Sequence, residues 1–165
     1  MLPNELNDLY KEVILDHYKN PRNTTEIVDP VHKARGYNPF CGDEVNLQIN
    51  LDNNQVIQDV GFQGHGCAIS QATASLMTES IKGKSIEEAL IIREEFRKMM
   101  QGEESNLEVL QDLEILEGRH PEITSHNASA IACFSCFLEN TKLTSLVGTG
   151  FLNLFKLCST SDFDK

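Results

Sequence analysis

The chain has 165 residues, enough for one domain with a hydrophobic core of its own. Acidic residues outnumber basic ones by 25 to 14, and no cluster of Lys and Arg interrupts the excess, so we expect no nucleic acid and no membrane among its partners. There is no apolar run long enough to span a bilayer and no pattern of a signal peptide. With an odd number of cysteines, five, we expect a cytoplasmic protein whose thiols are ligands or reactive groups rather than disulfides.

The first half of the chain predicts one helix and a small sheet. Apolar residues recur at helical spacing over residues 4–19, and His17 falls on that apolar face, where we interpret it as a packed core histidine. A short strand is expected near residues 31–37. Strict alternation over residues 45–51 predicts a half-buried strand, and the pattern continues after a turn into a second strand over residues 56–62.

The second half changes to helical periodicity. A helix is expected to begin close to Cys67, and Ser85 with Glu88 fits a capping box at the start of the next one. Four helices are expected in all after the sheet, over residues 69–81, 85–101, 107–116 and 128–138. A small antiparallel sheet followed by a run of helices is typical of the α+β class.

Two cysteine motifs on either side of the predicted hairpin carry the chemistry. Cys41 and Asp43 precede its first strand, and Cys67 follows its second strand, with glycine beside each thiol. Thiolate and carboxylate ligands suit zinc or iron, and the glycines would let the two ends converge. The helix start at Cys67 should lower the pKa of its thiol. The sequence therefore predicts a site that includes Cys41, Asp43 and Cys67.

The remaining cysteines and His65 allow more than one interpretation. Cys133 and Cys136 share a helical face and could supply a further ligand, but their apolar neighbours equally suit a packed core. Cys158 lies in an apolar tail and is expected to be inert. His65 is either a ligand or proton carrier, or an exposed turn histidine.

Three motifs in this order closely resemble the SufU/IscU/NifU-type iron–sulfur cluster assembly proteins. They are LYKEVILDHYKNPRN at residues 9–23, NPFCGD at residues 38–43 and GFQGHGCAIS at residues 61–70. The stretch over residues 99–118 is similar to the extra segment of the SufU branch. The resemblance covers about residues 5–118 and is highly specific.

The resemblance implies an α+β fold with a three-stranded antiparallel sheet and about five or six packed helices. It also implies a site of three cysteines and one aspartate that binds zinc, carries an assembling cluster, or receives sulfur. Cys41, Asp43 and Cys67 match the first three positions. The family's segment around its last cysteine has no counterpart here, so we assign that position to Cys133, with His126 or Cys136 as alternatives.

The hypothesis from the sequence is a zinc-holding sulfur acceptor with a cysteine desulfurase and apo iron–sulfur recipients as partners. Cys67 and Cys133 would be the reacting thiolates and Asp43 an exchangeable ligand. A scaffold that carries a transient iron–sulfur cluster is the alternative, and a structural zinc-binding partner module or a cysteine hydrolase are rivals of other classes. We expect an assembly domain over residues 1–143, an atypical tail over residues 144–165, and a monomer or weak oligomer.

Overall fold

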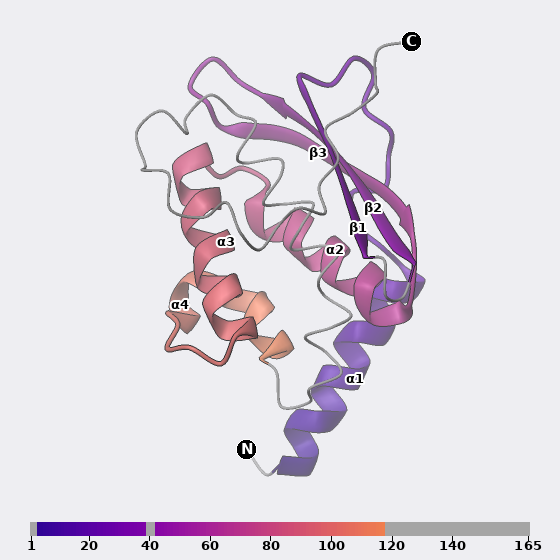
Figure 1. The fold of residues 1–165 in the computed structure, drawn as a ribbon, viewed down its shortest axis with the longest axis vertical. Coiled ribbons are helices and arrows are strands. Elements are labelled where there is room, and N and C mark those ends of the chain that lie inside the picture. Colours follow the sequence, from indigo (N-terminus) through magenta and orange to yellow (C-terminus); the bar gives the residue numbers. More distant parts are fainter. Residues whose placement is uncertain (1–2, 39–41, 118–165) are drawn as a thin grey trace.

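The described part of the chain contains four α-helices, three β-strands and one 3₁₀ helix. The structure is a computed structural model that describes residues 3–38 and 42–117, with side chains from residue 8 onward. In chain order the elements are α1 (Pro3–Lys19), β1 (His32–Asn38), β2 (Asp43–Leu51), β3 (Ile57–His65), α2 (Ala68–Ile81), α3 (Ile86–Met100), α4 (Leu107–Leu110) and the 3₁₀ helix η1 (Gln111–Leu116). This is the expected α+β class, with the expected three-stranded antiparallel sheet (Figure 1).

The sheet has β2 at its centre and alternates cleanly between a buried and an exposed face. Val45, Leu47 and Ile49 of β2 are fully buried, whereas the residues between them are only half-buried. Leu47 pairs with Phe62 of β3, which is also buried. Because side chains in a strand point to opposite faces in turn, this pattern gives the sheet one face toward the core. The predicted hairpin is confirmed.

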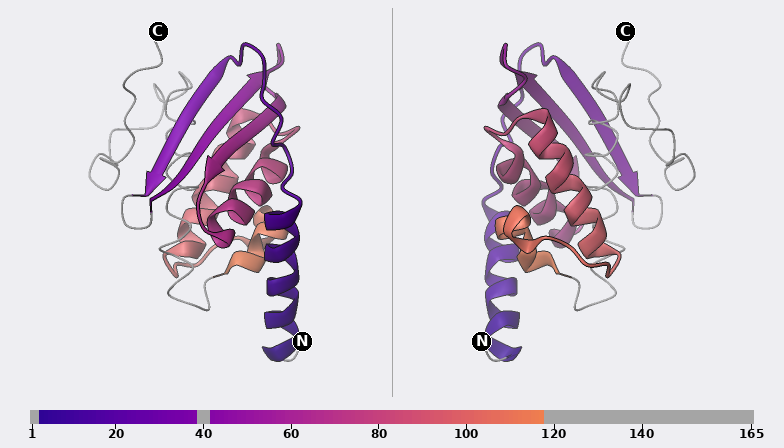
Figure 2. Two further views of the ribbon diagram at one scale, coloured as in Figure 1. Left: turned by 90° about the vertical axis from the view of Figure 1, so that its right-hand side faces the viewer. Right: turned by 90° about the vertical axis from the view of Figure 1, so that its left-hand side faces the viewer.

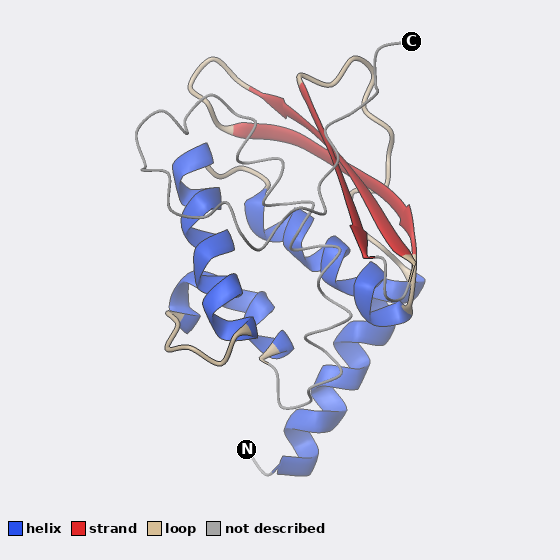
Figure 3. Ribbon diagram, viewed as in Figure 1, coloured by secondary structure: helices blue, strands red, loops and turns tan. Residues whose placement is uncertain are grey.

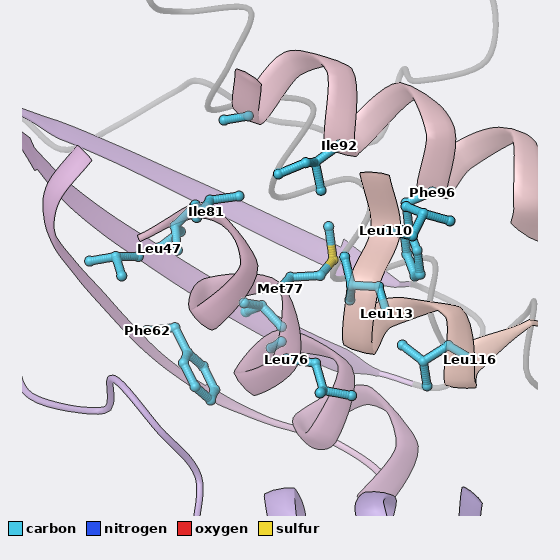
Figure 4. Packing of buried hydrophobic residues seen from close by; sticks show 14 of the residues in the cluster. Leu47, Phe62, Leu76, Met77, Ile81, Ile92, Phe96, Leu110, Leu113 and Leu116 are labelled. Carbon is cyan, nitrogen blue, oxygen red and sulfur yellow. The ribbon is translucent and has the colours of Figure 1, made fainter. Parts of the chain in front are cut away.

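Helices α2 and α3 lie on one side of the sheet, as the turned views show (Figure 2). Figure 3 distinguishes these helices from the strands by colour. Between these layers, Met77 of α2, Phe96 of α3 and Leu113 of η1 meet in the buried cluster (Figure 4). Each of these side chains is almost completely removed from solvent. Burial of large apolar side chains is the main source of folding free energy, so this cluster is what fixes the helices against the sheet.

Helix α1 packs against α2 through a polar contact as well as apolar ones. His17 is 6% exposed, and its Nδ1 lies 2.9 Å from Oγ of Ser75 on α2. The same hydroxyl accepts a hydrogen bond from the backbone N–H of Arg22, also at 2.9 Å. The interpretation of His17 as a packed core histidine is confirmed. It ties the end of α1 to the middle of α2.

The helical half differs from the expectation in one region. The capping box at Ser85 and Glu88 is confirmed, since each side chain accepts a hydrogen bond from the other residue's backbone N–H. The single helix expected over residues 107–116 is instead the one-turn helix α4 followed by η1. The helix expected over residues 128–138 lies outside the described residues, so the expected total of five or six helices is not confirmed. None of the described helices is long and apolar enough to cross a membrane.

Candidate functional site

The candidate site lies where one end of the sheet meets the start of α2. Asp43 is the first residue of β2, and Cys67 directly precedes α2. The two segments lie side by side because β2 and β3 are antiparallel, with Glu44 opposite His65. The structure therefore brings Asp43 and Cys67 together, as the sequence predicted. Cys41 lies outside the described residues.

Asp43 has a buried carboxylate, and one of its two oxygens has no hydrogen-bond partner among the described residues. The alternation of β2 places it on the same buried face as Val45, and it is 3% exposed. Its Oδ1 accepts a hydrogen bond of 3.2 Å from the backbone N–H of Cys67. Its Oδ2 is also buried and has no hydrogen-bond partner among the described residues. An acceptor buried in this way is costly unless a donor or a cation satisfies it, which makes Oδ2 a natural ligand atom.

Cys67 is a free, half-buried thiol that caps helix α2. Its Sγ accepts a hydrogen bond of 3.4 Å from the backbone N–H of Ser70. Burial raises the pKa of the thiol; the N–H of Ser70 lowers it, and the charge of Asp43 raises it again. The net shift is upward, so the expectation that the helix start would lower this pKa is wrong for the metal-free protein. The helix does act in the predicted direction, but burial outweighs it.

Gly66 permits the close approach of these two segments. A Cβ built on Gly66 would lie 2.7 Å from Cγ and 2.8 Å from Oδ1 of Asp43, distances at which the carboxylate would have to move. The sequence suggested that the glycines beside the thiols serve to bend the backbone. For Gly66, the structure gives a different reason, which is that any side chain would displace the Asp43 carboxylate.

None of the other histidine and cysteine candidates is among the described residues of the site. His65 is exposed at the end of β3 and pairs with Glu44, so it lies on the sheet face opposite to Asp43. The structure does not bring it to the site. The remaining candidates are outside the described residues, namely Cys133, Cys136, Cys158 and His126. Within the described ranges, no group of three or more His, Cys, Asp and Glu could hold a metal ion by itself.

Tyr10 carries a buried hydroxyl that the sequence did not single out. It lies on α1, its Oη is buried, and this oxygen has no hydrogen-bond partner among the described residues. Burial raises the pKa of Tyr10, and the charge of Cys67 raises it further. In the sequence, Tyr10 falls among the residues that recur at helical spacing over residues 4–19. Only its hydroxyl, a polar group within that apolar face, could have indicated another role.

The described donor atoms are of the kinds that zinc binds. Asp43 Oδ2 is a buried carboxylate oxygen with no hydrogen-bond partner among the described residues. Cys67 Sγ is the sulfur of a free thiol on the neighbouring segment. Zinc takes carboxylate oxygen and thiolate sulfur in four-coordinate sites. These two residues would supply two of the four positions, and the structure describes no third ligand.

Comparison with known proteins gives the family. Residues 9–117 match the model of the NifU-like N terminal domain. The chain belongs to this family. The resemblance of the sequence to the SufU/IscU/NifU-type assembly proteins is thereby confirmed.

Several NifU-like relatives are similar over most of their length. The chain is 46% identical to the zinc-dependent sulfurtransferase SufU of Bacillus subtilis over 68% of this chain and 76% of that protein. It is 40% identical to the iron–sulfur cluster assembly scaffold protein IscU of Streptococcus pyogenes, over 72% and 74%. A crystal structure from Fervidobacterium islandicum, described as a candidate iron–sulfur cluster assembly scaffold protein for the SUF system, superposes with a TM-score of 0.72. It is 33% identical and covers 80% of this chain and 98% of its own.

Proposed function

We propose that this NifU-like chain is an iron–sulfur cluster assembly protein that accepts persulfide sulfur from a cysteine desulfurase at a zinc-holding site. The observation that carries the proposal is the Asp43 carboxylate. It is buried beside the free thiol of Cys67, with Oδ1 on the Cys67 N–H and Oδ2 unpartnered. The 46% identity to a zinc-dependent sulfurtransferase supports this function over others in the family.

The proposed ligands are Cys41, Asp43, Cys67 and Cys133, with Cys136 or His126 as alternatives for the last position. Three sulfurs and one oxygen are a donor set that zinc accepts. When bound, zinc keeps coordinating thiols deprotonated at neutral pH, which offsets the raised pKa of Cys67. The oxygen ligand Asp43 would be the easiest to exchange, because a soft metal holds sulfur more firmly.

The sulfur transfer itself is a thiol exchange in which atoms and charge balance. A thiolate of this chain, proposed to be that of Cys133, attacks the outer sulfur of the persulfide on the desulfurase. A new S–S bond forms, the S–S bond of the donor breaks, and the donor cysteine leaves as a thiolate. Meanwhile Cys67 is held in place by the N–H of Ser70 and by the bond from its own N–H to Asp43. A thiolate of the recipient would then attack the outer sulfur on this chain in the same way, so that the S–S bond on this chain breaks and its cysteine leaves as a thiolate. The recipients would be apo iron–sulfur proteins.

Single substitutions test the site. We expect Cys41→Ser, Asp43→Asn and Cys67→Ser each to weaken zinc binding by about tenfold or more and to abolish stimulation of desulfurase turnover. The matched control is Asp59→Asn, an exposed aspartate on β3 that should change neither quantity. Bound zinc is measured after gel filtration, and turnover is measured as alanine release. Unchanged values for all three site variants would refute the proposal.

A second function is favoured by the 40% identity to an IscU scaffold protein, namely assembly of the cluster on this chain. Anaerobic reconstitution with iron and sulfide separates the two. A visible chromophore that survives gel filtration supports the scaffold, and retention of zinc without one supports sulfur transfer. A chain that holds zinc but leaves desulfurase turnover unchanged would instead be a structural zinc-binding partner module.

We further propose that the assembly domain spans residues 1–143, ahead of a separate tail over residues 144–165. The protein would act in the cytoplasm as a monomer or weak oligomer. A reducing compartment suits this function, because the acceptor thiols must remain free.

A further inference from the structure

Gln71, near the start of α2, contacts the turn that leads into Cys67. Its side chain is half-buried, and its Oε1 accepts hydrogen bonds from the backbone N–H of His65 and of Gly66, each at 3.2 Å. In the reverse orientation of the amide, the amino group would face these two donors and the oxygen would face acceptors, so the hydrogen bonds decide the orientation. One side chain therefore satisfies two successive N–H groups just before Cys67.

The backbone of Gln71 holds the other end of the same turn. Its N–H donates to the carbonyl of Cys67 at 3.1 Å. The N–H of Cys67 donates in turn to Asp43 Oδ1 at 3.2 Å. Each of the three backbone N–H groups from His65 to Cys67 thus has a side-chain acceptor, Gln71 for the first two and Asp43 for the third. The place of Cys67 relative to Asp43 depends on both side chains.

Packing does not explain a glutamine at this place in α2. Residues 70 and 72–78 are all buried, and Gln71 alone in that stretch keeps part of its surface exposed. Methionine would have a similar length and helix propensity, but its sulfur is only a weak acceptor.

The turn itself needs an outside restraint. Gly64 and Gly66 lie on either side of His65, and glycines leave a backbone intrinsically flexible. Because His65 and Gly66 are exposed, water could satisfy their N–H groups if the Gln71 side chain were absent, so the two bonds add little to folding stability. Their effect is to hold the turn in one conformation.

We propose that Gln71 is a positioning residue of the zinc-holding site, whose side-chain carbonyl fixes the turn at His65 and Gly66 and thereby the direction from which Cys67 faces Asp43. This inference rests on the proposed function, since it assigns a support to the same site. The bonds of the carbonyl go to the backbone of the turn and not to a ligand atom, so Gln71 acts through Cys67. Removal of groups that orient a metal ligand in this indirect way weakens metal binding by about 10- to 100-fold in other proteins.

Two substitutions of Gln71 separate the acceptor from the bulk of the side chain. Gln71→Met removes the amide carbonyl, whereas Gln71→Glu keeps an oxygen that can accept the same two bonds. The matched control is Gln58→Met, at an exposed glutamine of β3. Zinc affinity is measured by competition with a chromophoric chelator. We expect about tenfold weaker binding in Gln71→Met, and affinities close to that of wild type in Gln71→Glu and Gln58→Met.

Amide hydrogen exchange in the metal-free protein, read residue by residue by NMR, tests the turn without zinc. In Gln71→Met we expect the N–H groups of His65 and Gly66 to exchange about fivefold faster, because their acceptor is gone. The N–H of Cys67 should also exchange faster, although its own bond goes to Asp43, because the turn before it is no longer fixed. The urea concentration at the midpoint of unfolding should stay that of wild type.

Three outcomes overturn the inference. Unchanged exchange at His65 and Gly66 means that the two bonds do not exist. Faster exchange there, with Cys67 exchange and zinc affinity as in wild type, means that the turn does not position the ligand. A fall in zinc affinity that is matched by a fall in the urea midpoint means that Gln71 supports the whole fold. If instead wild type binds no zinc, but Cys67 exchanges faster in Gln71→Met, the proposed function fails and the positioning of Cys67 by Gln71 stands.

Discussion

The contact between Gly66 and the Asp43 carboxylate leaves no room for even a methyl group. We expect Gly66→Ala to push the carboxylate away from the Cys67 N–H, because a Cβ would lie 2.7 Å from Asp43 Cγ. Overpacking of this kind costs about 1–3 kcal/mol. Urea unfolding of the metal-free protein measures that loss, and zinc binding should weaken in parallel because a ligand has moved.

A double-mutant cycle tells whether the clash is with this particular side chain. In an Asp43→Ala background the atoms nearest to the new methyl are gone, so Gly66→Ala should cost less than half as much there. An equal cost in both backgrounds would mean that the backbone conformation of Gly66, and not the carboxylate, is what excludes alanine.

Single-residue chemistry was predictable from the sequence only in part. The juxtaposition of Asp43 and Cys67 followed from the hairpin, because antiparallel strands bring their outer ends together. The direction of the Cys67 pKa shift did not follow, since the helix start visible in the sequence is outweighed by burial that only the fold reveals. The unpaired hydroxyl of Tyr10 was not predictable either, because the apolar pattern of a helical face does not show whether a hydroxyl on it finds a hydrogen-bond partner.

The interface between helices α1 and α2 contains a histidine whose surroundings favour its neutral form. Ser75 Oγ accepts from the N–H of Arg22, which leaves its own proton available for an unprotonated Nδ1 of His17. Burial is the largest cause that lowers the pKa of His17, and the charge of Arg22 adds to it. The carboxylate of Glu79, whose Oε2 lies 3.7 Å from Nε2, raises the pKa of His17, but by less than the other causes lower it.

This histidine should make stability depend on pH in a defined direction. Because its folded pKa lies below the usual 6.5, the unfolded chain takes up a proton first as the pH falls. The contribution of His17 is therefore complete above about pH 6.5 and is lost below it, by at most about 1.4 kcal/mol per pH unit. Urea unfolding of the metal-free protein from pH 7.5 to 5.5 should show a shallower decline in His17→Gln than in wild type.

The comparison between the two proteins isolates this one group. His32 also has a pKa lowered by burial, but it is present in both proteins and its contribution cancels. Parallel pH profiles for wild type and His17→Gln would show that His17 can be protonated in place without strain, contrary to the contacts described.

Regular elements were predictable where one local rule dominated. The alternation in β2 predicts a strand from a few residues, and the Ser85–Glu88 capping box predicts a helix start in the same way. Both predictions are confirmed. Residues 107–116 show an apolar periodicity that suits an α-helix, yet the chain turns at Gln111, where φ is +50°, and continues as a 3₁₀ helix. Tertiary packing of Leu110, Leu113 and Leu116 into the core outweighs local helical preference there.

Across the molecule, one apolar layer connects the sheet, α2, α3 and η1, and the site lies at its edge. The layer fixes α2, whose first turn holds Cys67, against the sheet that carries Asp43 (Figure 1; Figure 4). Residues 107–116 are part of this layer. They lie within the stretch over residues 99–118 that, from the sequence, is similar to the extra segment of the SufU branch. Loss of residues 107–116 should therefore affect the whole fold and not only a peripheral surface.

Two leucines of this segment provide a matched test. Leu113 of η1 is 1% exposed and packs in the core, whereas Leu107 of α4 is 37% exposed. We expect Leu113→Ala to lower the free energy of unfolding by about 2–5 kcal/mol through lost burial and a cavity. Leu107→Ala should change it by about 0.5 kcal/mol or less. Urea unfolding monitored by circular dichroism measures both, and equal costs would mean that η1 does not belong to the core around which the site is built.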